Sequence, residues 1–300
     1  MTRRAPELQE SAIRWNLEPS PPTSDDEVIE RLLAESQAYR TLLQLALGQL
    51  FDSTTRERHR RGGGDMTLTA RLAAKNDLAR LIDDLTAFIR RYCVVTDHER
   101  LIIAVWIIHT YCIGPDEPFQ TPYLNITSPV PGSGKSLLLR LLKVLAKDVQ
   151  LAASISGAAM KRMIDEEAPV LLIDELDAFL GGNKERAETV RGILNSGFER
   201  DGRFIDCEGP QHTRRNYKTF CPKAFAGLGK YALEDSTRSR CIPIAMKRKR
   251  RDEIVGKFRE RKVRAQAEPL IERLPAIAAR IKPELEKDED PYLPESLEGR

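Results

Sequence analysis

The sequence predicts an α/β fold, with a mainly parallel sheet covered by helices and preceded by an α-helical region. Two observations predict it. From residue 123 onward, short β-rich apolar runs alternate with helical segments, which is typical of parallel sheets. Before residue 115, apolar residues recur at helical spacing. The chain has 300 residues, 41% of them hydrophobic, so it can bury a substantial core.

Charge and composition exclude several classes of protein. Lys and Arg number 48 against 45 Asp and Glu, a net charge of +3, so only local basic patches remain as candidates for polyanion binding. The longest apolar run is about 14 residues, which is too short to span a bilayer, so we expect no membrane partner. The N-terminus lacks the apolar centre of a secretory signal, which favours a cytoplasmic location. The five cysteines lack metal-binding spacing, and we expect mostly reduced core thiols.

The first part of the chain is expected to be a tail followed by helices. Residues 1–23 are polar and proline-rich, which predicts a disordered tail. Residues 24–114 predict a helical N-terminal region, whose first helix ends near Leu50. Its last helix is predicted to begin at Thr96, because Glu99 three residues later completes a capping box.

The rest of the chain divides into an α/β core at residues 115–246 and a helical C-terminal segment at residues 247–300. The C-terminal segment is first basic and then acidic. The core contains five apolar runs that predict strands. They are residues 123–127, 149–153, 170–173, 223–228 and 241–245.

A glycine-rich turn between the first β-run and an apolar helix is the strongest chemical signal. Residues 128–136 read Ser-Pro-Val-Pro-Gly-Ser-Gly-Lys-Ser. Gly132 and Gly134 allow a tight turn whose backbone N–H groups converge on phosphate oxygens, and the following helix N-terminus adds partial positive charge. The sequence therefore predicts an ATP-binding loop. Its residues are Pro131, Gly132, Ser133, Gly134, Lys135 and Ser136.

Two side chains of this loop are expected to act on the nucleotide. Lys135 would reach the β- and γ-phosphates, and Ser136 would give its hydroxyl to Mg²⁺. The pattern Gly-x-x-x-x-Gly-Lys-Ser/Thr is met except at its first position, where Pro129 replaces glycine. We therefore expect ATP and Mg²⁺ as cofactors.

Two carboxylates follow an apolar run downstream of the loop. This run ends in Asp174 and Glu175, and open α/β sheets bind ligands at the carboxyl ends of their strands. Asp174 would hold Mg²⁺ through water, and Glu175 would orient the water that attacks the γ-phosphate. Asp177 is interpreted as a helix cap or a surface acid. The loop and the acids together predict a P-loop NTPase that hydrolyses ATP.

Phosphoryl transfer often uses a further cation, which a neighbouring subunit can supply. Arg240, just before the last β-run, is the first candidate and Arg238 is the second. The alternative is that both are surface arginines. A catalytic Arg240 acting between subunits would make the working form a homo-oligomer.

Two basic segments are candidates for binding nucleic acid. Residues 203–207 and 216–220 are expected to pair as a hairpin with a basic tip. Residues 247–264 contain ten Lys/Arg against three Asp/Glu, which suits polyanion binding. The alternative is a solvated charged surface, because aromatic stacking residues are scarce. The candidate contacts are Arg214, Arg215, Lys218, Lys247, Arg248, Lys249, Arg250 and Arg251.

The loop, the acidic run and the segments around other β-runs share features with one known family. They are residues 127–129, 134–136, 172–175, 193–197, 222–227 and 240–244. Together they resemble the helicase-like P-loop domain of unknown function found in phage, plasmid and actinobacterial proteins, often fused to primase-polymerase modules. The resemblance covers roughly half the chain, from about residue 88 to about residue 250. In that family the loop commonly begins Ser-Pro, as it does here.

The resemblance implies an ATPase of the additional-strand-catalytic-glutamate class, with an arginine near the last strand that matches Arg240. It also implies a DNA motor in phage or plasmid replication, working as a ring of six subunits with a primase or another replication protein as partner. A nucleotide-dependent assembly module that does not unwind DNA is the alternative, and a regulatory or defence ATPase is a third reading. The β-run 223–228 lacks the Asn or Thr that motor ATPases usually use as a sensor, which leaves Lys230 or no residue, so that role stays unassigned.

Overall fold

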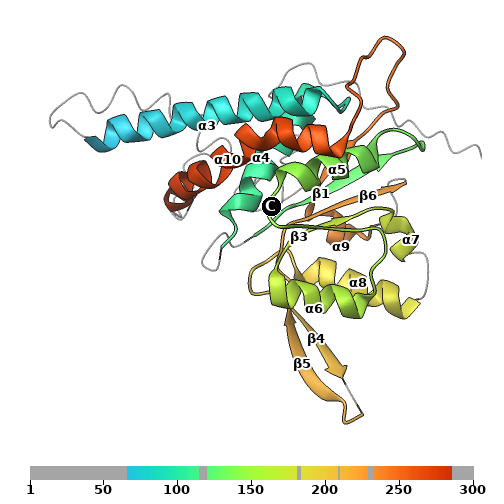
Figure 1. Ribbon diagram of the computed structural model, residues 1–300. Coiled ribbons are helices and arrows are strands. Elements are labelled where there is room, and N and C mark those ends of the chain that lie inside the picture. The colour runs from blue at the N-terminus through green and yellow to red at the C-terminus, as the bar shows by residue number, and fades with distance from the viewer. Residues whose placement is uncertain (1–65, 115–119, 181–183, 209, 229–232, 286–300) are drawn as a thin grey trace, which may run out of the picture.

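The computed structural model describes five segments of the chain, shown in Figure 1. They are residues 66–114, 120–180, 184–208, 210–228 and 233–285. The expected tail at residues 1–23 and the expected first helix ending near Leu50 lie outside the described residues, as does Lys230.

A five-stranded sheet forms the centre of the fold, in the order β2-β3-β6-β1-β7. Every pair of neighbouring strands is parallel, which confirms the predicted α/β class. β6 is inserted between β1 and β3. The strands are β1 (Tyr123–Ser128), β2 (Val149–Ala152), β3 (Val170–Ile173), β6 (Lys223–Leu228) and β7 (Cys241–Ala245).

Helices lie on both sides of these strands. In Figure 1, α5 lies on one side, and α6 and α8 lie on the other. All four residues of β3 are buried, as expected for a parallel strand covered on both faces. The helices that follow the strands are α5 (Lys135–Leu145), α6 (Gly157–Glu167), α7 (Leu176–Leu180), α8 (Lys184–Ser196) and α9 (Asp235–Arg238).

Three further helices form a layer over α5. They are α3 (Met66–Arg90), α4 (Asp97–Cys112) and α10 (Glu260–Leu285). α10 packs against α3, α4 and α5, and the apolar residues of this layer and of the sheet form one continuous core. The predicted capping box of α4 is confirmed, because Thr96 and Glu99 each accept a hydrogen bond from the other's backbone N–H. None of the helices in the described part of the chain is long and apolar enough to cross a membrane.

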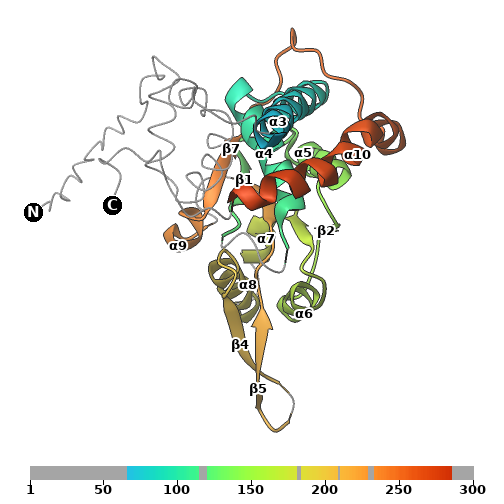
Figure 2. The same cartoon turned by 90° about the vertical axis from the view of Figure 1, so that its left-hand side faces the viewer.

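A β-hairpin leaves the body of the molecule between α8 and β6. It consists of β4 (Arg203–Glu208) and β5 (Thr213–Lys218), paired antiparallel with Arg203 opposite Lys218. Figures 1 and 2 both show it projecting from the end of the molecule opposite α3 and α10. The expected hairpin is therefore confirmed, but its second strand begins at Thr213 and ends at Lys218, so Arg214 and Arg215 lie in the strand, and Thr219 and Phe220 lie beyond it. The Thr219 hydroxyl is buried and hydrogen-bonded to the Ser196 hydroxyl at 2.9 Å, because the chain there turns back into the core.

The cysteines agree with the expected core thiols. None of the five, all within the described residues, forms a disulfide, and four of them are buried. Cys207 on β4 is the exposed exception.

Candidate functional site

The glycine-rich loop connects the end of β1 to the start of α5. The Ser128 hydroxyl donates to the Val130 carbonyl at 2.9 Å, which tightens the turn. Gly132 and Gly134 have φ values of 73° and 95°, in the left-handed region that glycine adopts most readily. No side chain caps the first turn of α5. Since the first N–H groups of a helix lack intrahelical partners, this end of α5 can bind an anion.

Ser133 adds a second polar feature to the loop. Ser133 is 8% exposed, and its hydroxyl oxygen has no hydrogen-bond partner among the described residues. Buried hydroxyls in native proteins nearly always have a partner, because leaving one unsatisfied costs about 1–3 kcal/mol. A ligand with acceptor oxygens would satisfy it. Lys135 is half-buried and Ser136 is exposed at the start of the helix.

Asp174 and Glu175 follow β3 directly. The Asp174 N–H donates to the Ala152 carbonyl at 3.1 Å, and the Asp174 carboxylate accepts a hydrogen bond from the Glu175 N–H at 3.1 Å. Asp174 is half-buried and Glu175 is exposed. Glu175 has φ 56°, a left-handed conformation that is uncommon outside glycine and that clusters at functional sites.

The strand register places the loop and the acids at one edge of the sheet. In β6, Phe225 pairs with Ile173, the last residue of β3, and Gly227 pairs with Thr127 near the end of β1. One strand lies between β1 and β3, so the two strands are about 10 Å apart. The loop and the acids therefore follow strands that end at the same edge of the sheet with β6 between them. The backbones of Lys135, Ser136, Asp174 and Glu175 therefore lie at the same edge of the sheet.

Asp177 occupies a more specific place than the sequence analysis assigned to it. It is half-buried in the first turn of α7, and its carboxylate oxygen lies 2.9 Å from the position that a Cβ on Gly227 would take. The first-turn position is close to the interpretation as a helix cap, and the side chain is only partly at the surface because it packs against the end of β6. A glycine at the end of a β-run was the signal in the sequence that marks this close approach.

Arg240 lies at the opposite edge of the sheet. Its carbonyl accepts a hydrogen bond from the N–H of Tyr123, the first residue of β1, whereas the loop follows the last residue. The length of β1 therefore separates Arg240 from the loop by about 20 Å. Its guanidinium donates to the Ser236 carbonyl and lies 5.9 Å from the centre of the Phe198 ring. The structure does not bring Arg240 to the loop of its own chain.

Arg238, the second candidate, is exposed on α9. It forms an ion pair with Asp235 at 2.8 Å and donates to the Leu233 carbonyl at 2.8 Å.

The expected nucleic-acid residues fall into two groups at opposite ends of the molecule. Arg214, Arg215 and Lys218 belong to β5 of the hairpin. Lys247–Arg251 belong to the irregular segment between β7 and α10, which lies beyond α5 in Figures 1 and 2. All eight side chains are exposed.

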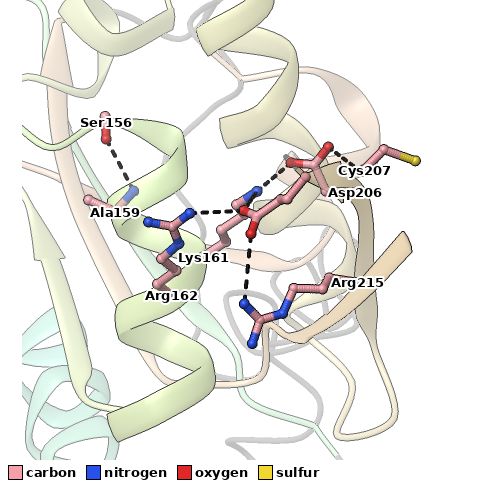
Figure 3. A network of polar contacts seen from close by, with 8 residues as sticks. Ser156, Ala159, Lys161, Arg162, Asp206, Cys207 and Arg215 are labelled. Carbon is pink, nitrogen blue, oxygen red and sulfur yellow. Dashed lines mark hydrogen bonds and ion pairs between the residues drawn. The ribbon is translucent and has the colours of Figure 1, made fainter. Parts of the chain in front are cut away.

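A charged network that the sequence analysis did not find holds the hairpin against α6 (Figure 3). Lys161 on α6 is 3% exposed and forms ion pairs with Asp206 and, at 2.8 Å, with Glu208 on β4. Arg162 and Arg215 also reach the Glu208 carboxylate, at 3.2 and 3.8 Å. The hydrogen bond from Lys161, followed by contacts with Tyr217 and Arg162, lowers the pKa of Glu208 to about 2. The acids of β4 alternate along the strand, which was the only trace of this network in the sequence.

Sequence comparison finds no family model that matches the chain and no curated relative, and the structural similarity described here is weak. Among 145 matching chains of solved structures is the A-form apo structure of the NrS-1 C-terminal region, with 14% identity and a TM-score of 0.38. The match covers 67% of this chain and 45% of that chain, so it spans less than half of the solved region. At this identity and TM-score the likeness carries no information about function.

Proposed function

We propose that the protein binds Mg²⁺-ATP and hydrolyses its γ-phosphate by in-line attack of water. One observation carries the proposal: a glycine-rich loop that opens an uncapped helix and two acids after a buried strand share one edge of the sheet, with one strand between them. Phosphoryl transfer requires positioned cations and donors on one side of the phosphate chain and a water-orienting group on the other.

The loop would bind the triphosphate. Backbone N–H groups from Gly132 to Ser136 would donate to its oxygens, and the Lys135 ammonium would neutralise the β- and γ-phosphates. The unpartnered hydroxyl of Ser133 would donate to a phosphate oxygen.

The residues present fit Mg²⁺. This ion prefers oxygen ligands, keeps several waters and uses only one or two protein groups beside substrate phosphates. The Ser136 hydroxyl and the Asp174 carboxylate are oxygen donors of this kind. The described ranges contain no group of three His, Cys, Asp or Glu side chains that could hold a metal by themselves, which suits an ion bound with the nucleotide. When bound, Mg²⁺ would neutralise charge on the phosphates.

Glu175 would accept a proton from the attacking water. Its left-handed backbone interrupts the alternation of the strand, so Asp174 and Glu175 need not point to opposite faces of the sheet. This conformation allows two adjacent acids to serve one site, one toward the metal and the other toward the water. Each of these roles needs a carboxylate that is ionised at neutral pH.

We infer that the ATPase works as a helicase-like motor on DNA in an oligomer. Two exposed basic segments support DNA as partner. The edge position of Arg240 supports a role between subunits, because the residue cannot reach the loop of its own chain.

Nucleotide binding tests the proposal directly. The wild-type chain is titrated into a fluorescent ATP analogue with Mg²⁺, beside Lys135→Ala and Glu175→Gln. Arg140→Ala is the matched control, because it removes an exposed cation from the same helix. We expect Lys135→Ala to lose binding and Glu175→Gln and Arg140→Ala to retain it. Equal binding by Lys135→Ala and Arg140→Ala would contradict the proposal.

Mixing two inactive variants tests the role of Arg240. In an equal mixture of Glu175→Gln and Arg240→Ala chains, about a quarter of the interfaces would join an intact Glu175 to a neighbour's intact Arg240. We therefore expect about a quarter of the wild-type turnover to return. A mixture no more active than its components would contradict catalysis between subunits. Mixtures that turn over ATP without unwinding DNA would favour the nucleotide-dependent assembly module.

A further inference from the structure

The segment between β7 and α10, residues 246–259, is an irregular loop with seven Lys/Arg against two Asp/Glu. We propose that this β7–α10 loop binds a single strand of nucleic acid. Its phosphates would contact Lys247, Arg248 and Arg251, and a base would lie against Ile254. The inference deepens the nucleic-acid part of the proposed function by naming the strand type and the contacting residues.

Both ends of the β7–α10 loop are fixed to the body of the protein. At one end, the N–H of the buried Met246 donates to the Thr127 carbonyl at 2.8 Å. At the other, the Gly256 N–H donates to the Arg91 carbonyl at 2.7 Å. A loop held at both ends loses less conformational entropy when it binds a ligand.

The two acids of the β7–α10 loop form a hydrogen bond and ion pairs with Arg250 of the same loop. The Arg250 N–H donates to the Glu253 carboxylate at 2.6 Å, and the Arg250 guanidinium lies 3.4 Å from Asp252 and 3.6 Å from Glu253. Lys249 donates to the Glu253 carbonyl at 3.0 Å. No described residue forms an ion pair with the three remaining cations of the run, which are exposed. These cations, Lys247, Arg248 and Arg251, are therefore available for phosphates.

Ile254 follows Arg251 by three positions in the same loop and is 94% exposed. An apolar side chain that inserts into a duplex must unstack a base step, at a cost of a few kcal/mol, whereas unpaired bases expose their faces without that cost. A membrane surface would require a much larger apolar face, whereas the neighbouring Val255 is half-buried. The combination of free cations and one exposed apolar side chain favours a single strand.

The position of the loop distinguishes it from the hairpin. The Met246 methyl carbon lies 3.4 Å from the position of a Cβ on Gly134, so the β7–α10 loop begins beside the glycine-rich loop. On the hairpin, by contrast, Arg215 already faces Glu208.

Fluorescence anisotropy with a labelled oligothymidine of about 30 nucleotides tests the cations, without any nucleotide present. The loop variant is Lys247→Gln, Arg248→Gln and Arg251→Gln together. The matched control removes the same charge from exposed positions of α10, with Arg261→Gln, Lys262→Gln and Arg264→Gln. We expect the loop variant to lose at least about tenfold in affinity and its salt slope to fall by about 2, from three lost phosphate contacts. An equal loss in both variants, or none in the loop variant, would overturn the inference.

Ile254→Ser tests the base contact. We expect about a fivefold loss of affinity for oligothymidine and none for heparin, a polyanion without bases. Equal effects on both probes, duplex DNA bound as tightly as the single strand, or Ile254-dependent binding to anionic vesicles in place of DNA would each overturn it. Because the anisotropy titration contains no nucleotide, its outcome does not depend on ATP binding or hydrolysis, so a failed ATPase proposal and a failed loop proposal give different results. Thermal melting confirms that each variant is folded.

Discussion

A buried histidine makes a quantitative prediction about acid stability. His109 on α4 is 2% exposed, and its Nε2 atom lies 3.1 Å from the Thr121 hydroxyl. Burial lowers its pKa from 6.5 to about 4, because the imidazolium form would lose its hydration. Between these values the unfolded chain binds the proton that the folded chain excludes. The neutral His109 therefore contributes about 3 kcal/mol to the free energy of unfolding above pH 6.5, and this contribution is lost as the pH falls toward 4.

The His109→Gln variant isolates this contribution. Its amide can still bond Thr121 but does not titrate, so its unfolding free energy should fall less than that of the wild type between neutral pH and pH 4. The expected difference is about 3 kcal/mol in urea unfolding curves. His212→Gln is the control, because His212 is exposed on the hairpin. Parallel pH profiles for wild type and His109→Gln would refute the reasoning.

Three further changes test particular contacts. Gly197→Ala would put a Cβ 2.3 Å from the Thr219 carbonyl oxygen, so denaturant unfolding should show a loss of about 3 kcal/mol, and unchanged stability would contradict this packing. Lys161→Met removes the buried ammonium between β4 and α6, so hydrogen exchange in the hairpin should become faster while that of β1 and β3 stays the same. Exchange that rises equally in the sheet would argue against a local anchor. Gly134→Ala strains a residue at φ 95° by about 1 kcal/mol and should weaken ATP binding, which a nucleotide titration measures.

Local patterns predicted much of the fold. The apolar runs identified the strands of the sheet, and the capping box identified the start of α4, because both depend on residues close in sequence. The loop before α5 and the acids after β3 were also predicted from residues close in sequence. Their position at one edge of the sheet followed from the rule that parallel strands align their carboxyl ends.

Contacts between distant segments could not be predicted in this way. Lys161 and Glu208 are 47 positions apart, and the alternating acids of β4 do not indicate which cation they pair with. The approach of Met246 to Gly134 also depends on β7 lying next to β1, which periodicity does not reveal. Strand order and tertiary packing decide such contacts.

Steady-state phosphate release with Mg²⁺ and ATP tests the central claim most directly. The wild-type chain and Glu175→Gln are compared at equal ATP occupancy, each with and without single-stranded DNA. The account predicts turnover by the wild type, stimulated by the strand, and at least a hundredfold less by Glu175→Gln, roughly the effect of removing a general base. Equal turnover by the two chains, or none by a wild-type chain saturated with ATP, would contradict it.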